Sequence, residues 1–317
     1  MKTVFLNVSK LDFDNKLDFS QLTNLTSVTT YAASNDQEIV ERVTDQNIVI
    51  TKELPVGSEL IRQFPPSVKL ICEAGTGYNN IDLNAAREKG ITVCNVPGYS
   101  TEAVAQLAIT FMLSLSASLT KQHAMLKQKN FDNFTKHLVV PHFEIQDKTL
   151  GIIGSGSIGQ QVITIARALG MNILVYNRTP RSWNDQQIKS VSLEELFMRS
   201  DFISLHCPLT PETRHIVNIT RLSLMKPSAF VINTSRGSLI KETDLIEALQ
   251  AGKIAGAALD VQDPEPPELT NPLFDMDNVI MTPHIGWKPL EARQRLINLL
   301  AGNIDAFIQG KPVNVVS

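Results

Sequence analysis

The chain has 317 residues, of which 43% are apolar and 19% are charged. This length and composition predict a globular protein with two domains and exclude a disordered or fibrous chain. The net charge is −3 and there is no run of lysine and arginine, so a nucleic acid is not expected as a partner.

The N-terminus and the cysteines indicate the cellular compartment of the protein. The first residues, MKTVFLNVSKLDFD, become polar after a short apolar run, which predicts a first strand rather than a secretory signal. Cys72, Cys94 and Cys207 are odd in number and lack CxxC spacing. This pattern favours reduced thiols over a disulfide framework or a zinc site. We therefore expect a cytoplasmic protein without a bound metal.

Short β-branched runs alternate with polar or helical segments over the first 100 residues. The runs VFLNV, SVTTY, NIVIT, KLICEAG and ITVCNV are typical of strands, and SNDQEIVERV and NIDLNAAREKG are typical of helices. This alternation predicts a parallel sheet with helices on its faces.

An apolar helix is predicted at residues 103–119, within TEAVAQLAITFMLSLSASLT. It is shorter than a bilayer requires and is interrupted by Gln106 and several serines and threonines, so no membrane span is expected. A helix that is apolar nearly all round needs burial on several sides. We expect it to pack inside its own domain and against a second subunit, and therefore predict a homodimer.

A second β/α domain begins with KTLGIIGSGSIGQQVITIARALGMNILVYN, which indicates a strand, a glycine turn, a helix and a strand. The segments DFISLHCPL, AFVINTS, KIAGAALDV and NVIMTPHIG are typical of further strands, and KETDLIEALQAG of a helix that ends near Gly252. A last helix, in PLEARQRLINLLAGNIDAFIQG, ends at Gly310 and could return to the first domain. The fold class is therefore α/β, with two parallel sheets.

Gly154, Gly156 and Gly159 form GxGxxG between the strand TLGII and the helix QQVITIARALG. In this context the first glycine makes a tight turn, the second lets the backbone approach a pyrophosphate, and the third lets helix and strand pack closely. The helix N-terminus, with Ser157 and Ile158, would bind the anion. The motif predicts a dinucleotide site, and the alternative is a plain glycine turn.

The end of the next strand influences the choice between NAD and NADP. An acidic residue usually accepts hydrogen bonds from the ribose of NAD there, but this chain has Asn177, followed by Arg178 and Thr179. Asn177 does not repel a 2′-phosphate, and Arg178 with the nearby Arg181 could bind one, which favours NADP. NAD stays open as the cofactor, because Arg178 could instead stack on adenine or point to water.

Three loops that follow predicted strands carry an arginine, a carboxylate and a histidine. They are INTSRGSLI with Arg236, AALDVQDPEPPE with Asp260 and Glu265, and MTPHIGW with His284. Ligands of open α/β sheets bind beyond the carboxyl ends of strands, so these loops can converge on the crevice of the glycine turn. Each residue alone could be structural. Together they provide what the reversible reduction of a 2-oxo acid needs.

These motifs resemble those of the D-isomer-specific 2-hydroxyacid dehydrogenases over nearly the whole chain. The matching segments are GIIGSGSIG, LHCPLTPET, NTSRG, GAALDV with a following EP, and TPHIG, and the first domain adds EAGTGYNNID and GITVCNVPG. The resemblance implies a discontinuous, flavodoxin-like substrate domain of residues 1–99 and 286–317. It also implies a Rossmann-like NAD(P)-binding domain of residues 100–285.

The resemblance further implies a role for each site residue. Arg236 would bind the carboxylate and carbonyl of the substrate, His284 would give a proton to the carbonyl oxygen, and Glu265 would accept a hydrogen bond from the other ring nitrogen. Asp260 would hold the nicotinamide side of the cofactor. The expected cofactor contacts are Gly154, Gly156, Ser157, Ile158, Gly159, Asn177, Arg178, Thr179, Cys207, Pro208, Thr234 and Asp260. The expected substrate contacts are Gly75, Thr76, Gly77, Arg236, His284 and Trp287.

Two features resemble the glycerate dehydrogenases, or hydroxypyruvate reductases, of this family. Gln106 stands where many members have glutamate, and KPLEARQRL follows HIGW, whose Trp287 could line a small pocket or serve only in packing. We expect hydroxypyruvate or glyoxylate as the substrate, with a phosphoglycerate dehydrogenase or a D-lactate-type dehydrogenase as alternatives. Glu265 argues against a formate dehydrogenase, which would have glutamine there. Outside enzymes, the alternative is a dinucleotide-sensing binding protein similar to the corepressors of this fold.

Overall fold

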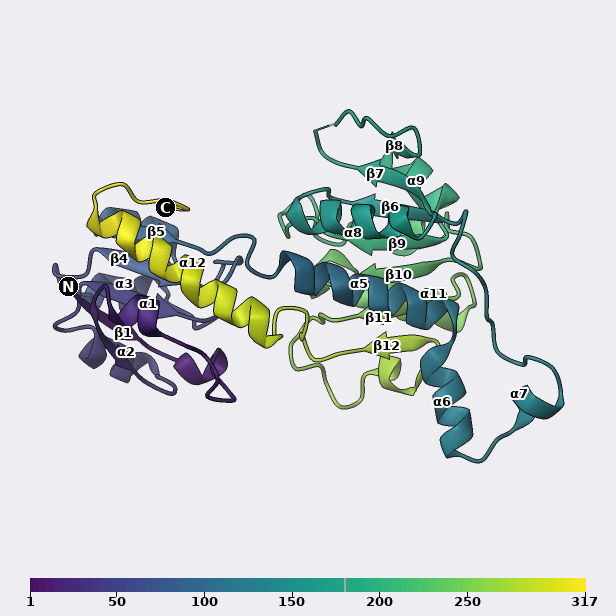
Figure 1. The fold of residues 1–317 in the computed structure, drawn as a ribbon, viewed down its shortest axis with the longest axis horizontal. Coiled ribbons are helices and arrows are strands. Elements are labelled where there is room, and N and C mark those ends of the chain that lie inside the picture. Colours follow the sequence, from purple (N-terminus) through teal and green to yellow (C-terminus); the bar gives the residue numbers. More distant parts are fainter. Residues whose placement is uncertain (180) are drawn as a thin grey trace. The chain divides into compact units, whose positions relative to one another are not determined.

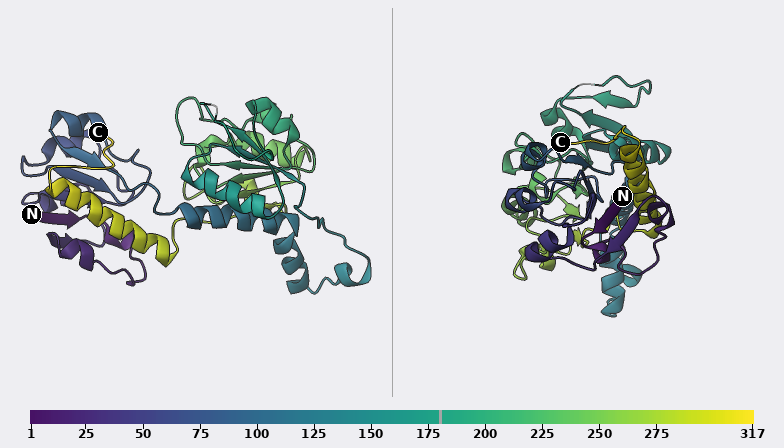
Figure 2. Two further views of the ribbon diagram at one scale, coloured as in Figure 1. Left: turned by 45° about the horizontal axis from the view of Figure 1, so that its top comes forward. Right: turned by 90° about the vertical axis from the view of Figure 1, so that its left-hand side faces the viewer.

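Two separate parallel sheets, one of five strands and one of seven, organise the chain. The computed structural model describes residues 1–179 and 181–317. Met1–Ser100 and Trp287–Ser317 form one unit around the smaller sheet, and Thr101–Gly286 form a second unit around the larger one. Helices cover both sheets (Figures 1 and 2). The predicted α/β class with two parallel sheets is thereby confirmed.

The smaller sheet has the strand order β2-β1-β3-β4-β5. Its strands are β1 (Lys2–Phe5), β2 (Ser27–Thr30), β3 (Ile48–Thr51), β4 (Leu70–Glu73) and β5 (Thr92–Cys94). The helices of this unit are η1 (Val8–Lys10), α1 (Ser20–Thr23), α2 (Asp36–Arg42), α3 (Ser58–Gln63), α4 (Leu83–Glu88) and α12 (Leu290–Ile308). Every residue of β3 and β4 is buried, which explains why both strands are continuous apolar runs rather than alternating ones.

A buried arginine fixes α12 to the N-terminal part of its unit. Arg293 is 2% exposed, donates to both carboxylate oxygens of Asp14 at 2.8 Å, and lies over the ring of Phe13. After α12 the chain runs back along β5, where the amide of Val316 donates to the carbonyl of Val93 at 2.9 Å. The C-terminal segment is thus tied to the edge strand of the smaller sheet.

The larger sheet has the strand order β12-β11-β10-β9-β6-β7-β8. Its strands are β6 (Thr149–Ile153), β7 (Asn172–Tyr176), β8 (Ile188–Ser190), β9 (Phe202–Leu205), β10 (Phe230–Asn233), β11 (Gly256–Leu259) and β12 (Val279–Met281). The helices are α5 (Thr101–Ser116), α6 (Leu119–Lys127), α7 (Asp132–Thr135), α8 (Ser157–Ala168), α9 (Leu193–Arg199), α10 (Ile219–Leu222), η2 (Gly237–Leu239), α11 (Glu242–Gln250) and η3 (Pro272–Asp275).

The apolar segment after residue 100 forms two helices rather than the single one predicted for residues 103–119. Helix α5 ends at Ser116, Ser118 adopts the left-handed backbone conformation with φ of 45°, and α6 follows at an angle of 60°. The hydroxyl of Ser118 donates to the carbonyl of Pro141, which stabilises this corner. In the described parts of the chain no single helix is long and apolar enough to cross a membrane, although α5 and α6 together pass the same criteria.

Three aromatic rings lie under the middle of the larger sheet. The rings of Phe202 and Phe230 stack with their centroids 5.3 Å apart, and Phe143 lies 6.1 Å from Phe202. The side chain of Phe202 is fully buried. These rings therefore contribute strongly to the core that supports the strands of the site.

We predict that Phe202→Ala lowers the free energy of unfolding of the larger unit by about 3–5 kcal/mol, because it leaves a cavity in a well-packed core. Urea unfolding followed by circular dichroism measures the loss. The control is Leu269→Ala, because Leu269 is 97% exposed and should change stability little. Equal effects of the two substitutions would contradict the assignment of this core.

Candidate functional site

Most of the predicted site residues lie at one edge of the larger sheet. Gly154 follows β6, Cys207 follows β9, Arg236 follows β10, Asp260 follows β11 and His284 follows β12. Because every strand of this sheet is parallel to its neighbours, all of these residues lie at the carboxyl edge (Figure 1). This is the edge at which open α/β sheets bind their ligands.

The three glycines of the turn between β6 and α8 have different surroundings. Gly154 has a φ of +93°, and a Cβ there would lie 2.7 Å from the backbone nitrogen of Cys207. A Cβ on Gly159 would lie 2.2 Å from the carbonyl oxygen of Gly154. A Cβ on Gly156, by contrast, would meet nothing within 4 Å. Packing therefore requires the first and third glycines, and the second leaves open space for a ligand.

The surroundings of the turn fit a dinucleotide. Gly156 is the N-cap of α8, a helix of 12 residues, whose first amides can donate to a pyrophosphate. In the part of the chain that the structure describes, the hydroxyl of Thr234, after β10, is buried without a hydrogen-bond partner. Buried hydroxyls are usually paired, so a bound group that accepts this bond would satisfy it.

The end of β7 contacts the glycine turn directly. The Oδ1 atom of Asn177 accepts a hydrogen bond from the amide of Ser155, and its Nδ2 atom donates to the Ser155 hydroxyl, both at 2.8 Å. Arg178 and Thr179 are exposed. A hydrogen bond from Thr210 and, to a lesser degree, the positive charge of Arg178 lower the pKa of Glu212. At the end of β7, where an acidic residue is usual, the chain thus has the neutral side chain of Asn177 followed by the exposed guanidinium of Arg178.

His206 and Cys207 form the wall behind the turn. The Nε2 atom of His206 lies 2.8 Å from the hydroxyl of Ser204, and burial lowers the pKa of His206 to about 4. Burial also raises the pKa of the Cys207 thiol to about 11. Both side chains are therefore neutral near pH 7 and serve as packing beside Gly154. Among the described residues, no cluster of three His, Cys, Asp or Glu side chains is placed to hold a metal ion.

His284 and Glu265 form a hydrogen-bonded pair. The Nδ1 atom of His284 lies 2.8 Å from Oε2 of Glu265, and the backbone amide of Gln262 donates to Oε1 at 3.0 Å. Both side chains of the pair are partly exposed. One ring nitrogen is therefore occupied by a carboxylate that is itself held by the backbone, and Nε2 is the ring nitrogen left for a ligand.

The backbone of His284 is held in the left-handed conformation, with φ of 50°. Histidine adopts this region more often than most residues, but the conformation still needs support. The support comes from Asp260, which is 1% exposed. Its Oδ1 accepts from the Thr282 hydroxyl at 2.6 Å and the Ile285 amide at 2.8 Å, and its Oδ2 accepts from the Gly286 amide at 2.9 Å.

Arg236 lies on the loop beside this pair. Its side chain is exposed and donates to the carbonyl of Ser235 at 2.8 Å. A Cβ on Gly237 would lie 2.1 Å from the carbonyl oxygen of Gln262, so the Arg236 loop and the Glu265 loop pack backbone to backbone. Sequence reasoning missed Gln262. Its role depends on a backbone amide, which leaves no signal in the choice of side chain.

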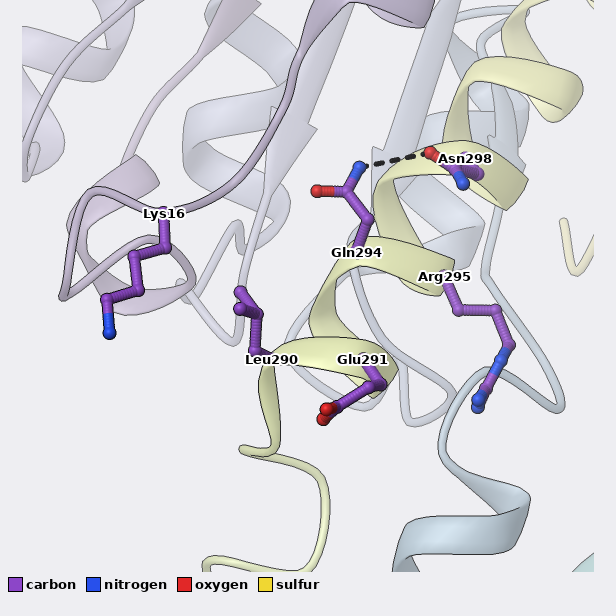
Figure 3. Close-up of a pocket in the computed structure, with 6 residues that line it drawn as sticks. All are labelled: Lys16, Leu290, Glu291, Gln294, Arg295 and Asn298. Carbon is purple, nitrogen blue, oxygen red and sulfur yellow. Dashed lines mark hydrogen bonds between the residues drawn. The ribbon is translucent and has the colours of Figure 1, made fainter.

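The remaining predicted residues belong to the smaller unit. Gly75, Thr76 and Gly77 follow β4, again at a carboxyl edge. Trp287 is buried, and the ammonium of Lys52 lies 4.0 Å from its ring centroid. An open hollow of about 460 Å³ lies in the same unit, along the first turns of α12, and Figure 3 labels the residues that line it. Its lining, which includes Gln294 and Arg295, contains none of the predicted residues.

Comparison with known proteins agrees with the features of this edge. The profile of the D-isomer specific 2-hydroxyacid dehydrogenase, NAD binding domain, matches residues 109–286. The hydroxypyruvate reductase of Blautia hydrogenotrophica is 40% identical over 285 residues, which are 89% of this chain and 88% of the relative. The glycerate dehydrogenase of Methylorubrum extorquens is 37% identical over 284 residues, 88% of each chain.

A solved structure resembles the whole chain. The acyclic imino acid reductase Bsp5, in complex with NADPH and D-Arg, superposes with a TM-score of 0.88 at 31% identity and covers 100% of both chains. The profile match, the two relatives and this superposition all point to the same fold and the same kind of cofactor site. The chain therefore belongs to the D-isomer-specific 2-hydroxyacid dehydrogenase family, whose members are oxidoreductases that act on CH–OH groups with nicotinamide dinucleotides.

Proposed function

We propose that the protein reduces hydroxypyruvate or glyoxylate to the corresponding D-2-hydroxy acid with NADPH or NADH. The observation that carries this proposal is the pair of His284 and Glu265, 2.8 Å apart, at the same sheet edge as the glycine turn. The relatives named hydroxypyruvate reductase and glycerate dehydrogenase support the choice of substrate.

His284 is assigned the proton transfer. With Nδ1 bonded to Glu265, the proton on Nε2 is the one available to the carbonyl oxygen of the substrate, and the same nitrogen takes it back in the oxidative direction. The carboxylate of Glu265 stabilises the imidazolium and fixes the plane of the ring. The amide of Gln262 in turn fixes the carboxylate. Because Glu265 occupies Nδ1 of His284, Nε2 stays available for the proton transfer.

Binding of the substrate is assigned to two further groups. Arg236 carries a planar guanidinium that can bond two oxygens at once, so it would bind the carboxylate and polarise the carbonyl. The backbone around Gly75, Thr76 and Gly77 would bind the carboxylate, and Trp287 would limit the size of the substrate. We assign residues 1–99 and 286–317 as the substrate domain and residues 100–285 as the cofactor domain.

The cofactor is assigned to the larger unit, and its nicotinamide, when bound, supplies the hydride. The turn residues Gly154, Gly156, Ser157, Ile158 and Gly159 would hold the pyrophosphate. Asn177, Arg178 and Thr179 would meet the adenosine ribose, and Cys207, Pro208, Thr234 and Asp260 would lie along the nicotinamide half. We propose NADP as the preferred cofactor, since Asn177 carries no charge and Arg178 is exposed.

We predict that His284→Ala lowers kcat for hydroxypyruvate by about 10²–10⁴-fold, because the proton donor is lost. Glu265→Gln should lower kcat less, since the ring keeps a hydrogen-bond partner but loses the charge that stabilises the imidazolium. Absorbance at 340 nm follows the turnover. The control is the exposed His142→Ala, which should match the wild type. If His284→Ala retained full activity, or if the wild type reduced no 2-oxo acid with either cofactor, the proposal would be wrong.

We predict that Asn177→Asp lowers kcat/KM for NADPH by roughly tenfold or more and leaves that for NADH equal or higher, because the new charge repels a 2′-phosphate. The substitution keeps the acceptor for the Ser155 amide, and the Ser155 hydroxyl, which accepts from Asn177, can instead donate to the new carboxylate, so the turn should be preserved. Initial rates with both cofactors measure the change. Because asparagine and aspartate have nearly the same shape, this variant tests mainly the effect of charge. An equal loss with both cofactors would argue against NADP preference.

We also propose that the protein forms a homodimer through residues 119–139, here called the arm, which comprises α6, α7 and the segment after them. The arm projects from the layers of the larger unit (Figure 1). Six of its large apolar side chains are exposed, with Phe134 at 77%. Exposed apolar groups concentrated on one segment are typical of a protein interface. The exposed members are Leu119, Leu126, Phe131, Phe134, Leu138 and Val139.

We predict that light scattering coupled to gel filtration finds the wild type at twice the chain mass of 35.0 kDa. Phe134→Asp should shift the protein towards the monomer, because it places a charge within an apolar interface. The control is Leu269→Asp, which changes an apolar residue outside the arm that is 97% exposed. A monomeric wild type, or an unchanged dimer in Phe134→Asp, would contradict this interface.

A further inference from the structure

Two carbonyl groups of the loop after β4 are tied to the chain that follows β5. The amide of Val96 donates to the carbonyl of Gly75 at 2.8 Å, and the side-chain Nδ2 of Asn95 donates to the carbonyl of Thr76 at 2.7 Å. The hydroxyl of Thr76 donates to the carbonyl of Val96 at 3.1 Å. The loop is therefore held against the residues that follow β5, with the carbonyls of Gly75 and Thr76 as acceptors and the Thr76 hydroxyl as a donor.

These ties determine where the donors of the loop point. In a trans peptide the N–H of one residue points opposite to the C=O of the residue before it, and the peptides of this loop are trans. With the carbonyls of Gly75 and Thr76 directed towards β5, the amides of Thr76 and Gly77 point to the opposite side. Among the described residues, neither amide donates to another group of the protein. Two adjacent amides that point the same way suit a carboxylate.

Asn95 is itself fixed by two more asparagines. The Nδ2 atom of Asn303, on α12, donates to the carbonyl of Asn95 at 2.8 Å, and the amide of Asn95 donates to the carbonyl of Asn314 at 3.2 Å. The Nδ2 atom of Asn314 donates to Oδ1 of Asn303 at 2.8 Å. Asn95 and Asn303 are both buried. A closed set of hydrogen bonds thus connects the C-terminal segment to the loop.

We propose that Asn95 is a positioning residue for substrate binding, held by Asn303 and Asn314. By bonding the carbonyl of Thr76 it directs the Gly77 amide towards the carboxylate of the 2-oxo acid. This inference rests on the proposed function, because it gives the loop a substrate to bind. It assigns the C-terminal segment a part in substrate affinity, although that segment contains no residue of the proposed reaction centre.

Kinetics of Asn95→Ala test the proposal. We expect KM for hydroxypyruvate to rise by about tenfold, with kcat within about threefold and KM for NADPH unchanged, since only a hydrogen bond that orients the carboxylate site is lost. Asn303→Ala, which does not touch Thr76, should raise the same KM by a smaller factor. It also provides the test if Asn95→Ala does not fold.

The matched control is Asn47→Ala. Asn47 lies in the same unit before β3, at the amino end of the sheet, and its side chain likewise bonds backbone groups of a neighbouring segment. The Asn47→Ala variant should have a lower melting temperature than the wild type and the same KM for hydroxypyruvate. If Asn95→Ala and Asn303→Ala also lower only the melting temperature, the asparagines are purely structural and the proposal is overturned.

Hydrogen exchange separates this proposal from the proposed function. The amide of Val96, which donates to the carbonyl of Gly75, should exchange faster in Asn95→Ala than in the wild type, and should not change in Asn47→Ala. If the wild type reduced no 2-oxo acid, the proposed function would fail, while this comparison would still decide whether Asn95 positions the loop. Unchanged exchange in Asn95→Ala would overturn the positioning role.

Discussion

The buried carboxylate of Asp260 is the group on which the geometry of the site depends. Its three hydrogen bonds to Thr282, Ile285 and Gly286 surround His284 on both sides in the sequence. They hold the histidine in a left-handed conformation that its own preferences would not maintain. With the backbone of His284 held in this conformation, its Nδ1 atom lies within hydrogen-bond distance of Glu265. The buried Asp260 thus fixes the position of His284, the proposed proton donor, at the carboxyl edge of the sheet.

The fold could be predicted because its signals are local. Buried parallel strands such as β3, β4 and β10 are short, continuous apolar runs. Gly252 follows α11 and Gly310 follows α12, as the sequence predicts. Both glycines adopt positive φ, which a residue with a side chain adopts at a cost. Gly154 and Gly159 could also be predicted, because only glycine fits between β6 and α8.

The details of the site could not be predicted, because they depend on tertiary partners. The resemblance implied that Asp260 holds the nicotinamide side of the cofactor, but only the fold shows that its carboxylate accepts from the amides after β12. Asn95 is one of many asparagines, and its importance appears only when the carbonyl of Thr76 lies beside it. The corner at Ser118 was missed for a related reason. No glycine or proline marks it in the sequence, and the left-handed turn is stabilised by the distant Pro141.

The most direct test of the account is the fate of a deuteride carried on C4 of the nicotinamide. The protein would be incubated with hydroxypyruvate and NADPH that carries deuterium at both C4 positions, and the product analysed by chiral chromatography and mass spectrometry. The account predicts D-glycerate with one deuterium at C2, because hydride arrives at that carbon while His284 protonates the oxygen. Glycerate without deuterium, the L-isomer or no product at all would contradict it.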